Sequence, residues 1–170
     1  VLFPKDKKTE SFDFEPFLFD PKTPHENTEF SIEFIKDNIR YLYEVELMKK
    51  AIVKEELTFW NPGKANLYKR TTNLSNQYTE ISFGSTIKID NASKKTLEAN
   101  TLWNNTVLGG YLKTNIDFNE LKSVYSWFSV NLKPMIGSVT DLEEFVSGQI
   151  NSGSVQKNDV IEILKKADFN

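Results

Sequence analysis

The residues best suited to chemistry are four glutamates, Glu44, Glu46, Glu55 and Glu56. Glu44 and Glu46 share a strand parity, so both side chains point to one face, where they can approach Lys54 or Glu56 across a hairpin. A carboxylate pair of this kind can exchange protons with a substrate or hold magnesium. Solvated charges on a sheet face are the commoner reason for such a pattern. We therefore predict no catalytic residue and no metal ligand here.

Three basic residues, Lys64, Lys69 and Arg70, surround one predicted hairpin. Cationic side chains grouped in this way can contact phosphate, so we name them as candidate contacts to phosphate or nucleic acid. The formal net charge of −3, with acidic and basic residues interspersed, argues against a dedicated nucleic-acid surface. Solvated surface lysines and arginines are the alternative interpretation.

Other catalytic and binding motifs are missing from the sequence. Gly63-Lys64 is followed by Ala65, and Thr58 stands where the phosphate-loop pattern G-x-x-x-x-G-K-[ST] needs its first glycine. We therefore predict a turn at Gly63-Lys64. His25 is the single histidine and lies among prolines, which excludes a Ser/His/Asp triad and a histidine-rich metal cluster. The absence of cysteine excludes disulfides and thiolate metal sites.

The elements that must position these side chains begin with a meander over residues 28–60. Apolar and polar residues alternate with period two along residues 28–34, 39–48 and 53–59, which predicts three antiparallel strands with one buried face. Residues 36–38 form the first reversal, because Asp37 and Asn38 tolerate the positive φ of tight hairpins. Residues 49–51 form the second reversal. After a turn at residues 61–64, residues 66–72 and 77–82 predict two further strands, about five in all.

Residues 1–27 form a proline- and aromatic-rich arm, since the prolines at positions 4, 16, 21 and 24 forbid long regular structure. We expect its phenylalanines, which include Phe3 and Phe17, to pack along the sheet. Residues 14–19 are a candidate for an additional edge strand.

The pattern becomes helical from about residue 90. Asn91 or Ser93 is predicted to cap a helix that runs toward Leu108 and stops at Gly109-Gly110. Asp117 or Asn119 is predicted to cap a second helix with an apolar face of Leu121, Val124, Tyr125, Phe128 and Leu132, ended by Pro134 and Gly137.

A capping box at residues 140–143, which opens with Thr140, predicts a third helix through Phe145, Val146 and Ile150. A fourth helix, over residues 156–167, is predicted to bury Val160, Ile161 and Leu164. Strands followed by helices are typical of the α+β class. We expect one domain, divided into an arm (1–27), a sheet (28–88) and a helical part on or beside the sheet (89–170).

The hydropathy of the chain and its two ends predict its cellular compartment and whether it is part of a longer protein. No apolar run approaches the length of a membrane span, and no signal peptide is visible, so we expect a cytoplasmic protein with no membrane partner. The chain begins at Val1 without methionine and ends on a predicted helix. We therefore expect a segment of a longer protein.

A series of short stretches, in this order and spacing, resembles the middle of bacterial AAA-type ATP/GTP-binding proteins, which are related to the ABC-type ATPases of OLD nucleases and SMC proteins. The resemblance covers nearly the whole chain. It is carried by residues 15–17, 19–21, 28–33, 39–41, 43, 46–47, 52, 55–57, 67–70, 83–85, 100–103, 124–128 and 164–168.

The resemblance implies an internal segment of an ATPase, between an upstream Walker A loop and a downstream signature motif and Walker B carboxylate. All of these are missing from this sequence. It further implies ATP and magnesium bound by the intact parent, and partners in the remainder of the ATPase head, a homodimer, and an effector protein or nucleic acid. A role in defence against phage is also implied. Family members often carry a glutamine near the stretch that matches residues 102–110, and this chain has none there, so no catalytic residue is transferred.

The residues also fit a protein of another class. A freestanding protein-binding module without enzymatic activity would use a sheet edge or the aromatic arm to hold its partner.

Overall fold

The computed structural model describes residues 4–16, 18–132 and 141–166. Several positions used in the sequence-based predictions lie outside the described residues, namely Phe3, Phe17, Pro134, Gly137, Thr140 and residues 167–168. The chain forms two compact units, residues 1–133 and residues 134–170. The predicted helical part is therefore divided between the two units.

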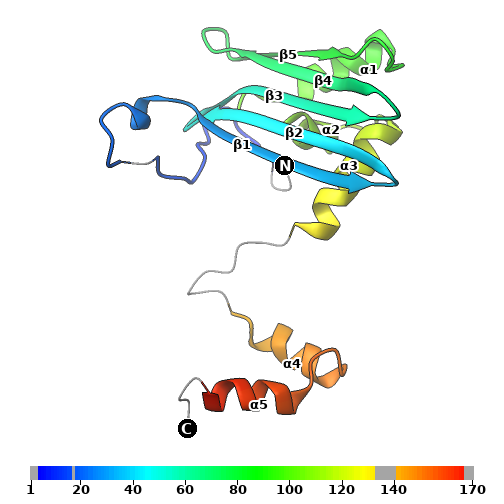
Figure 1. The fold of residues 1–170 in the computed structure, drawn as a ribbon. Helices are drawn as coiled ribbons and strands as arrows, with labels where there is room; N and C mark the ends of the chain where they lie inside the picture. Colours follow the sequence, from blue (N-terminus) through cyan, green and yellow to red (C-terminus); the bar gives the residue numbers. More distant parts are fainter. Residues whose placement is uncertain (1–3, 17, 133–140, 167–170) are drawn as a thin grey trace. The chain divides into compact units, whose positions relative to one another are not determined.

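The first unit contains a five-stranded antiparallel meander, which confirms the predicted α+β class with its strands before its helices (Figure 1). Neighbouring strands in the sheet are also neighbours in the sequence. The strands are β1 (Thr28–Lys36), β2 (Ile39–Met48), β3 (Ala51–Trp60), β4 (Lys64–Asn73) and β5 (Tyr78–Phe83).

The first reversal confirms the turn predicted from its residue types. Asp37 and Asn38 have φ values of 51° and 60°, the left-handed pair that a two-residue hairpin requires. Lys36 therefore pairs directly with Ile39, and this pairing fixes the register of β1 against β2 over its whole length.

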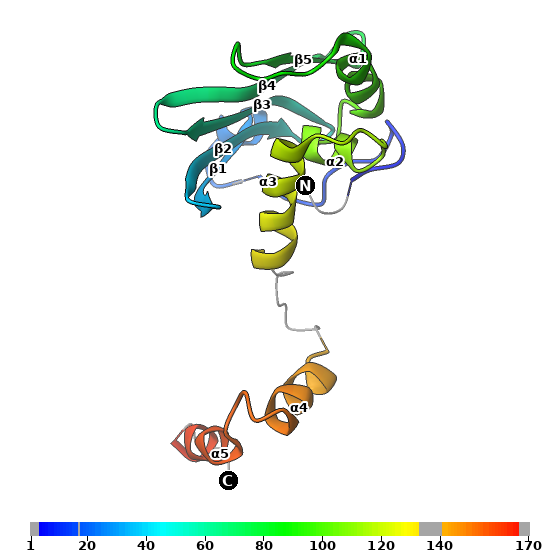
Figure 2. The same cartoon turned by 90° about the vertical axis from the view of Figure 1, so that its right-hand side faces the viewer.

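One face of the sheet is covered by three helices, α1 (Asn91–Asn100), α2 (Val107–Tyr111) and α3 (Asn119–Asn131) (Figure 2). Inward residues of the strands pack with helical residues of the predicted 3–4 spacing on α3. The buried core includes Phe34, Tyr41, Tyr43, Leu57, Tyr68, Leu97, Leu108, Leu121, Val124 and Phe128.

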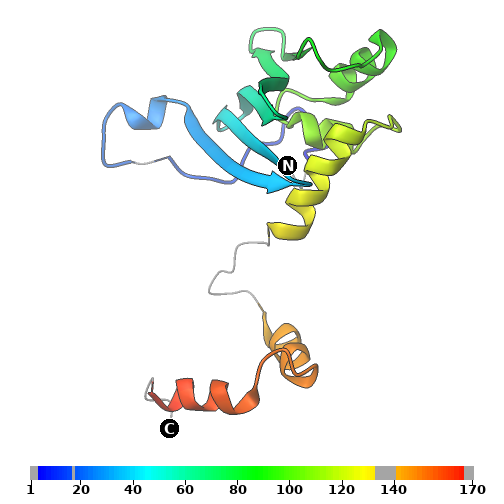
Figure 3. The ribbon, with the colours of Figure 1, turned by 45° about the vertical axis from the view of Figure 1, so that its right-hand side comes forward.

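Aromatic rings join α3 to the end of β1, where the two elements lie side by side (Figure 3). The Phe34 and Trp127 rings stack with centroids 4.1 Å apart. Phe128 meets Phe34 and Tyr43 edge to face, at 5.5 Å and 5.3 Å. Such offset and edge contacts are the favourable geometries for aromatic pairs.

The predicted helix from residue 91 toward Leu108 is wrong in its length and in its stop signal. α1 ends at Asn100, and Gly109-Gly110 lies inside α2, where both glycines are buried. A Cβ atom on Gly110 would lie 2.1 Å from the Thr101 hydroxyl oxygen, so this position needs glycine for close packing and not to end a helix.

The predicted helix caps are also corrected. Asp90 caps α1, and its carboxylate accepts hydrogen bonds from the backbone N–H groups of Ala92 and Ser93, both at 2.9 Å. α3 follows Phe118, which makes no side-chain capping bond, so neither Asp117 nor Asn119 is the cap. Phe118 itself is buried in the core.

The arm contains a single 3₁₀ turn, Thr23–His25, in its described part. The described residues of 14–19 form no strand, so the candidate edge strand is wrong there. Polar contacts hold the beginning of the arm to the loop between α1 and α2. Asn105 donates to the carbonyl of Lys5 at 2.7 Å, and Asn104 donates to the carbonyls of Lys7 and Glu10 at 2.8 Å and 2.9 Å.

Replacing Asn105 by Ala should release the beginning of the arm. The Lys5 backbone would lose both the donor and the acceptor that Asn105 supplies, which costs about 1–2 kcal/mol for partly buried groups. We expect trypsin to cleave after the lysines at positions 5, 7 and 8 faster than in the wild type. The exposed Asn76→Ala variant is the matched control, and equal cleavage rates in the two variants would contradict the assignment.

The second unit contains α4 (Glu143–Asn151) and α5 (Lys157–Lys166). Neither helix has a buried residue, so the predicted burial of Val160, Ile161 and Leu164 is wrong for this unit. Two short helices present too little apolar surface to enclose these side chains. Among the helices of the described residues, none has the length and apolar character to cross a bilayer.

Candidate functional site

The candidate site lies on the outer face of the sheet, opposite to the face that α1–α3 cover. The register places Glu44 opposite Glu56, and Glu46 opposite Lys54. The same residues of β2 face Ser31 and Glu29 on β1. The predicted approach of the Glu44–Glu46 pair to Lys54 and Glu56 is therefore confirmed.

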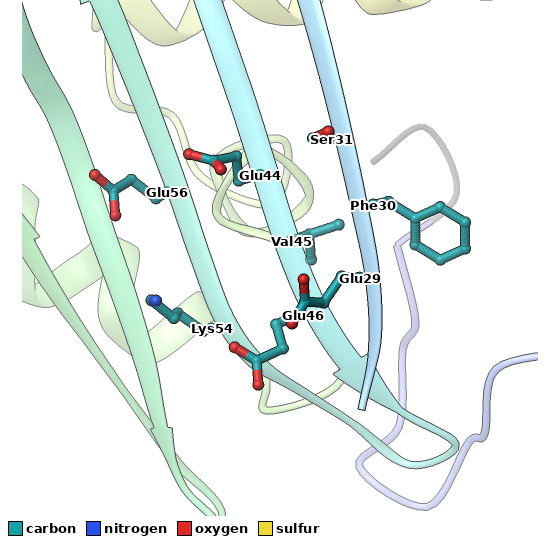
Figure 4. Close-up of a pocket in the computed structure, with 8 residues that line it drawn as sticks. All are labelled: Glu29, Phe30, Ser31, Glu44, Val45, Glu46, Lys54 and Glu56. Carbon is teal, nitrogen blue, oxygen red and sulfur yellow. The ribbon is translucent and has the colours of Figure 1, made fainter. Parts of the chain in front are cut away.

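These side chains line a recess of about 350 Å³ across β1, β2 and β3, which we call the acidic recess. Figure 4 shows the glutamates projecting from three adjacent strands, whereas the Phe30 ring lies beside β1 on the side away from β2. The lining residues are Glu29, Phe30, Ser31, Glu44, Val45, Glu46, Lys54 and Glu56.

Strand alternation explains why these charges gather. Tyr43, Val45 and Leu47 of β2 point into the core, so the intervening Glu44 and Glu46 must point outward. Because the three strands are in antiparallel register, outward residues of one strand lie beside outward residues of the next. A row of carboxylates along a single strand thus becomes a two-dimensional charged surface.

The carboxylates are only partly compensated. Glu56 accepts a hydrogen bond from Asn66 Nδ2 at 2.7 Å and forms an ion pair with Lys69 Nζ at 3.1 Å. Glu46 accepts a hydrogen bond from Asn27 Nδ2 at 2.7 Å. The lining itself carries four carboxylates and one ammonium, that of Lys54. Such a surface attracts cationic groups and repels phosphate.

Metal binding by the carboxylates was the alternative that their spacing raised. In residues 4–16, 18–132 and 141–166, no group of three or more His, Asp or Glu side chains is arranged to hold a metal ion.

The three candidate phosphate contacts, Lys64, Lys69 and Arg70, do not converge in the structure. Lys64 Nζ lies 5.6 Å from the centroid of the Trp60 ring, and the Arg40 guanidinium lies 4.4 Å from the same ring. Both distances are within the range of cation–π attraction. Lys69 remains at the surface but is paired with Glu56.

Arg70 is not at the surface, so its predicted role as a phosphate contact is wrong. The side chain is 0% exposed because Arg70 lies opposite Glu55 and Ile81 on the inner face. Its guanidinium donates to the carbonyls of Ile52 and Trp103, the latter at 2.9 Å. The guanidinium of Arg70 therefore binds backbone carbonyls inside the protein and is not accessible to a phosphate in solution.

Glu55 lies on the same inner face and is almost fully buried. Its carboxylate accepts hydrogen bonds from the hydroxyls of Tyr68 and Tyr43, at 2.7 Å and 3.1 Å, and from the Val107 backbone N–H at 2.9 Å. Val107 is the first residue of α2, where a carboxylate also interacts favourably with the helix dipole. Glu55 of β3 thus ties its own strand to β2, β4 and α2.

Burial dominates the ionisation behaviour of this cluster. It raises the pKa of Glu55, although the Arg70 charge and the tyrosine hydroxyls act in the opposite direction. Burial and the nearby Glu55 carboxylate also hold the pKa values of Tyr43 and Tyr68 well above 10.0. Burial lowers the pKa of Arg70. Because the cluster is sealed from solvent, we assign it a structural role.

The sequence contained a signal for this buried cluster. Glu55 shares its strand parity with Val53, Leu57 and Phe59, which marked it as inward-facing. Arg70 stands in the register position directly opposite. A charged residue of inward parity on each of two adjacent strands predicts a compensated buried pair.

No protein-family model, no curated protein and no solved structure matches this chain.

Proposed function

We propose that this chain is a non-catalytic portion of an ABC/OLD-like ATP-binding protein, and that its outer sheet face binds a cationic segment of a protein partner. The single observation that supports the binding role is the acidic recess, where four carboxylates gather around one lysine. The ABC/OLD-like setting is supported by the sequence resemblance alone.

A non-catalytic role is supported by the distribution of charge. Nucleotide phosphates need converging cations or backbone N–H groups. Here Lys64 lies on Trp60, Lys69 is paired with Glu56, and Arg70 is buried. The acidic recess would repel a triphosphate, so ATP and magnesium would bind in another part of the parent, where the phosphoryl transfer to water takes place.

In such a parent the sheet would act as a coupling surface. ATP-driven dimerisation of the head would reposition the outer face of the sheet. A basic segment of an effector or of the remaining head, bound to that face, would move with it. Defence against phage is the role that fits the resemblance. The rigid sheet suits coupling, since the buried Glu55 contacts connect β2, β3, β4 and α2.

Calorimetry with ATP and magnesium tests the setting. We expect no binding and no hydrolysis by residues 1–170, and binding by the full product of the encoding gene. Hydrolysis by the 170-residue chain would contradict the non-catalytic role. Absence of binding by both proteins would contradict the ATPase setting and leave the acidic recess to be tested by itself.

The double variant Glu44→Gln/Glu46→Gln tests the recess directly. A lysine-rich peptide is the probe, and its affinity should fall about three- to tenfold at low salt, because two exposed charge interactions are lost. The wild-type affinity should also fall with ionic strength. Glu80→Gln, on the outer face of β5, is the matched control. An unchanged affinity in the double variant would exclude the recess as the binding surface.

A freestanding protein-interaction module is the second candidate. It is favoured by the exposed edge of β1, where Phe30 and Ile35 are solvent-accessible. The encoding reading frame separates the two candidates, because a phosphate-loop pattern upstream of these residues would support the ATPase setting.

A further inference from the structure

The edge of β1 has the features of a strand that pairs with another chain. β1 ends the strand order, and within the described residues no group outside β2 forms a backbone hydrogen bond with Thr28–Lys36. Half of the backbone N–H and C=O groups of an edge strand point away from its neighbour. In β1 these groups form a row along nine residues.

β1 carries charged residues, Glu29, Glu33 and Lys36, but it lacks two other devices that commonly protect a sheet edge. It contains no proline, and its pairing with β2 shows no register shift that would mark a bulge. β5, at the opposite edge, has only six residues. Two large apolar side chains of β1 are exposed, Phe30 at 56% and Ile35 at 68%. A long, regular and partly apolar edge is a template for strand addition.

We propose that β1 pairs antiparallel with β1 of a second copy of this chain, centred on Ile32, and joins two five-stranded sheets into one. This inference requires neither nucleotide nor the acidic recess, and it names an occupant for the β1 edge on which the second candidate function rests. A second copy is favoured as the occupant because the sequence of β1 is complementary to itself in this register.

Charge selects the register. Centred on Ile32, the pairing places Glu29 opposite Ile35 and Ser31 opposite Glu33, so no like charges face each other. Centring on Ser31 would place Glu29 opposite Glu33, and centring on Glu33 would place that residue opposite itself. Both of these neighbouring registers set carboxylates against each other.

Apolar contacts favour the same register. The two copies of Ile32 would lie opposite each other, and Phe30 would lie opposite Phe34 of the second copy, at the edge of the buried Phe34–Trp127 stack. Cross-strand aromatic pairs are among the favourable contacts of an antiparallel sheet. The pairing would also cover the exposed Phe30 ring, which lies beside β1 on its open side (Figure 4).

Sedimentation velocity of the wild-type chain is the first measurement. We expect the mass to rise with concentration from 19.6 kDa to twice that value. Phe30→Lys should raise the dissociation constant at least about tenfold, because the lysine would lie in an apolar cross-strand contact. Tyr78→Lys, a substitution of an exposed aromatic residue on the opposite edge, should leave the constant unchanged.

A disulfide tests the register. The chain contains no cysteine, so Ile32→Cys introduces a single thiol. Opposite residues of an antiparallel pair have Cα atoms about 4.5–5.5 Å apart, which permits a disulfide. Oxidised Ile32→Cys should therefore form a covalent dimer. Phe30→Cys should not, since the two thiols would be offset by four residues, roughly 13 Å.

Three outcomes would overturn the proposal. The first is a wild-type chain that stays at the monomer mass at every concentration up to its solubility limit. The second is loss of the dimer in Tyr78→Lys but not in Phe30→Lys. The third is efficient crosslinking of Phe30→Cys in place of Ile32→Cys. Circular dichroism of each variant separates loss of pairing from loss of the fold.

Discussion

Replacing Arg70 by Met is expected to lower the free energy of unfolding by about 3–5 kcal/mol, because it removes one partner from a buried charged cluster. The carbonyls of Ile52 and Trp103 would lose their guanidinium donor, and buried acceptors without donors are costly. Glu55 would keep its tyrosine hydrogen bonds but lose the compensating positive charge. Urea denaturation monitored by tryptophan fluorescence measures the loss.

The matched control for Arg70→Met is Lys69→Met, which removes the neighbouring exposed cation of the same strand. Its cost should stay within about 1 kcal/mol, because Lys69 forms only a surface ion pair. The double variant Glu55→Gln/Arg70→Met should recover part of the loss at pH 7, since it no longer buries an uncompensated carboxylate. If the loss of unfolding free energy in the double variant equals the sum of the losses in Glu55→Gln and Arg70→Met, the two residues are not coupled.

The pH dependence of this loss has a defined sign. Burial raises the pKa of Glu55 above 4.5, so the stability contributed by its protonated form is fully present below pH 4.5 and is lost as the pH rises through the folded-state pKa. Removing the Arg70 charge raises that pKa further, because Arg70 lowers it in the wild type. The difference in stability between wild type and Arg70→Met should therefore grow as the pH rises above 4.5.

Gly84→Ala is expected to destabilise the protein by about 3 kcal/mol or more. A Cβ atom at Gly84 would lie 1.8 Å from the backbone carbonyl oxygen of Asn66, which the β3–β4 pairing holds in place. Overpacking a rigid site typically costs about 1–3 kcal/mol. The cost reaches the upper end of this range or exceeds it when a backbone atom must move. The hydrogen bond from the Gly84 N–H to the Leu67 carbonyl, at 3.1 Å, would be disturbed as well.

Gly63→Ala is the matched control, because no atom lies within 4 Å of a Cβ built at Gly63. We expect its stability to stay within about 0.5 kcal/mol of the wild type. Thermal and urea unfolding of the two alanine variants provide the comparison. Equal stabilities would show that the chain near Gly84 moves aside without cost.

The meander could be predicted from the sequence because two independent signals agree in it. Alternation defined which residues face inward, and Asp37-Asn38 defined the turn that fixes the register. Together they placed Glu44 and Glu46 beside Lys54 and Glu56, which is most of the acidic recess. The depth of the recess depends on the conformations of these side chains, and strand alternation predicts only the face to which each side chain points.

The remaining features depend on tertiary contacts that local residue types do not reveal. A glycine pair is the ordinary sign of a helix end, but at Gly109-Gly110 close packing against Thr101 decides its use. A charged residue is ordinarily at the surface, but Arg70 and Glu55 compensate each other inside. In both cases the preference of a single residue is overruled by a partner from a distant part of the chain.

The contacts of Asn104 and Asn105 with the arm also affect the order of folding during synthesis. The hairpins of the sheet are local in sequence and can form as soon as each pair of strands has left the ribosome. Within these 170 residues the arm is made before the sheet, but its partner Asn105 follows Lys5 by 100 residues. Although it precedes the sheet, the segment around Lys5, Lys7 and Glu10 is therefore among the last parts of the first unit to be fixed.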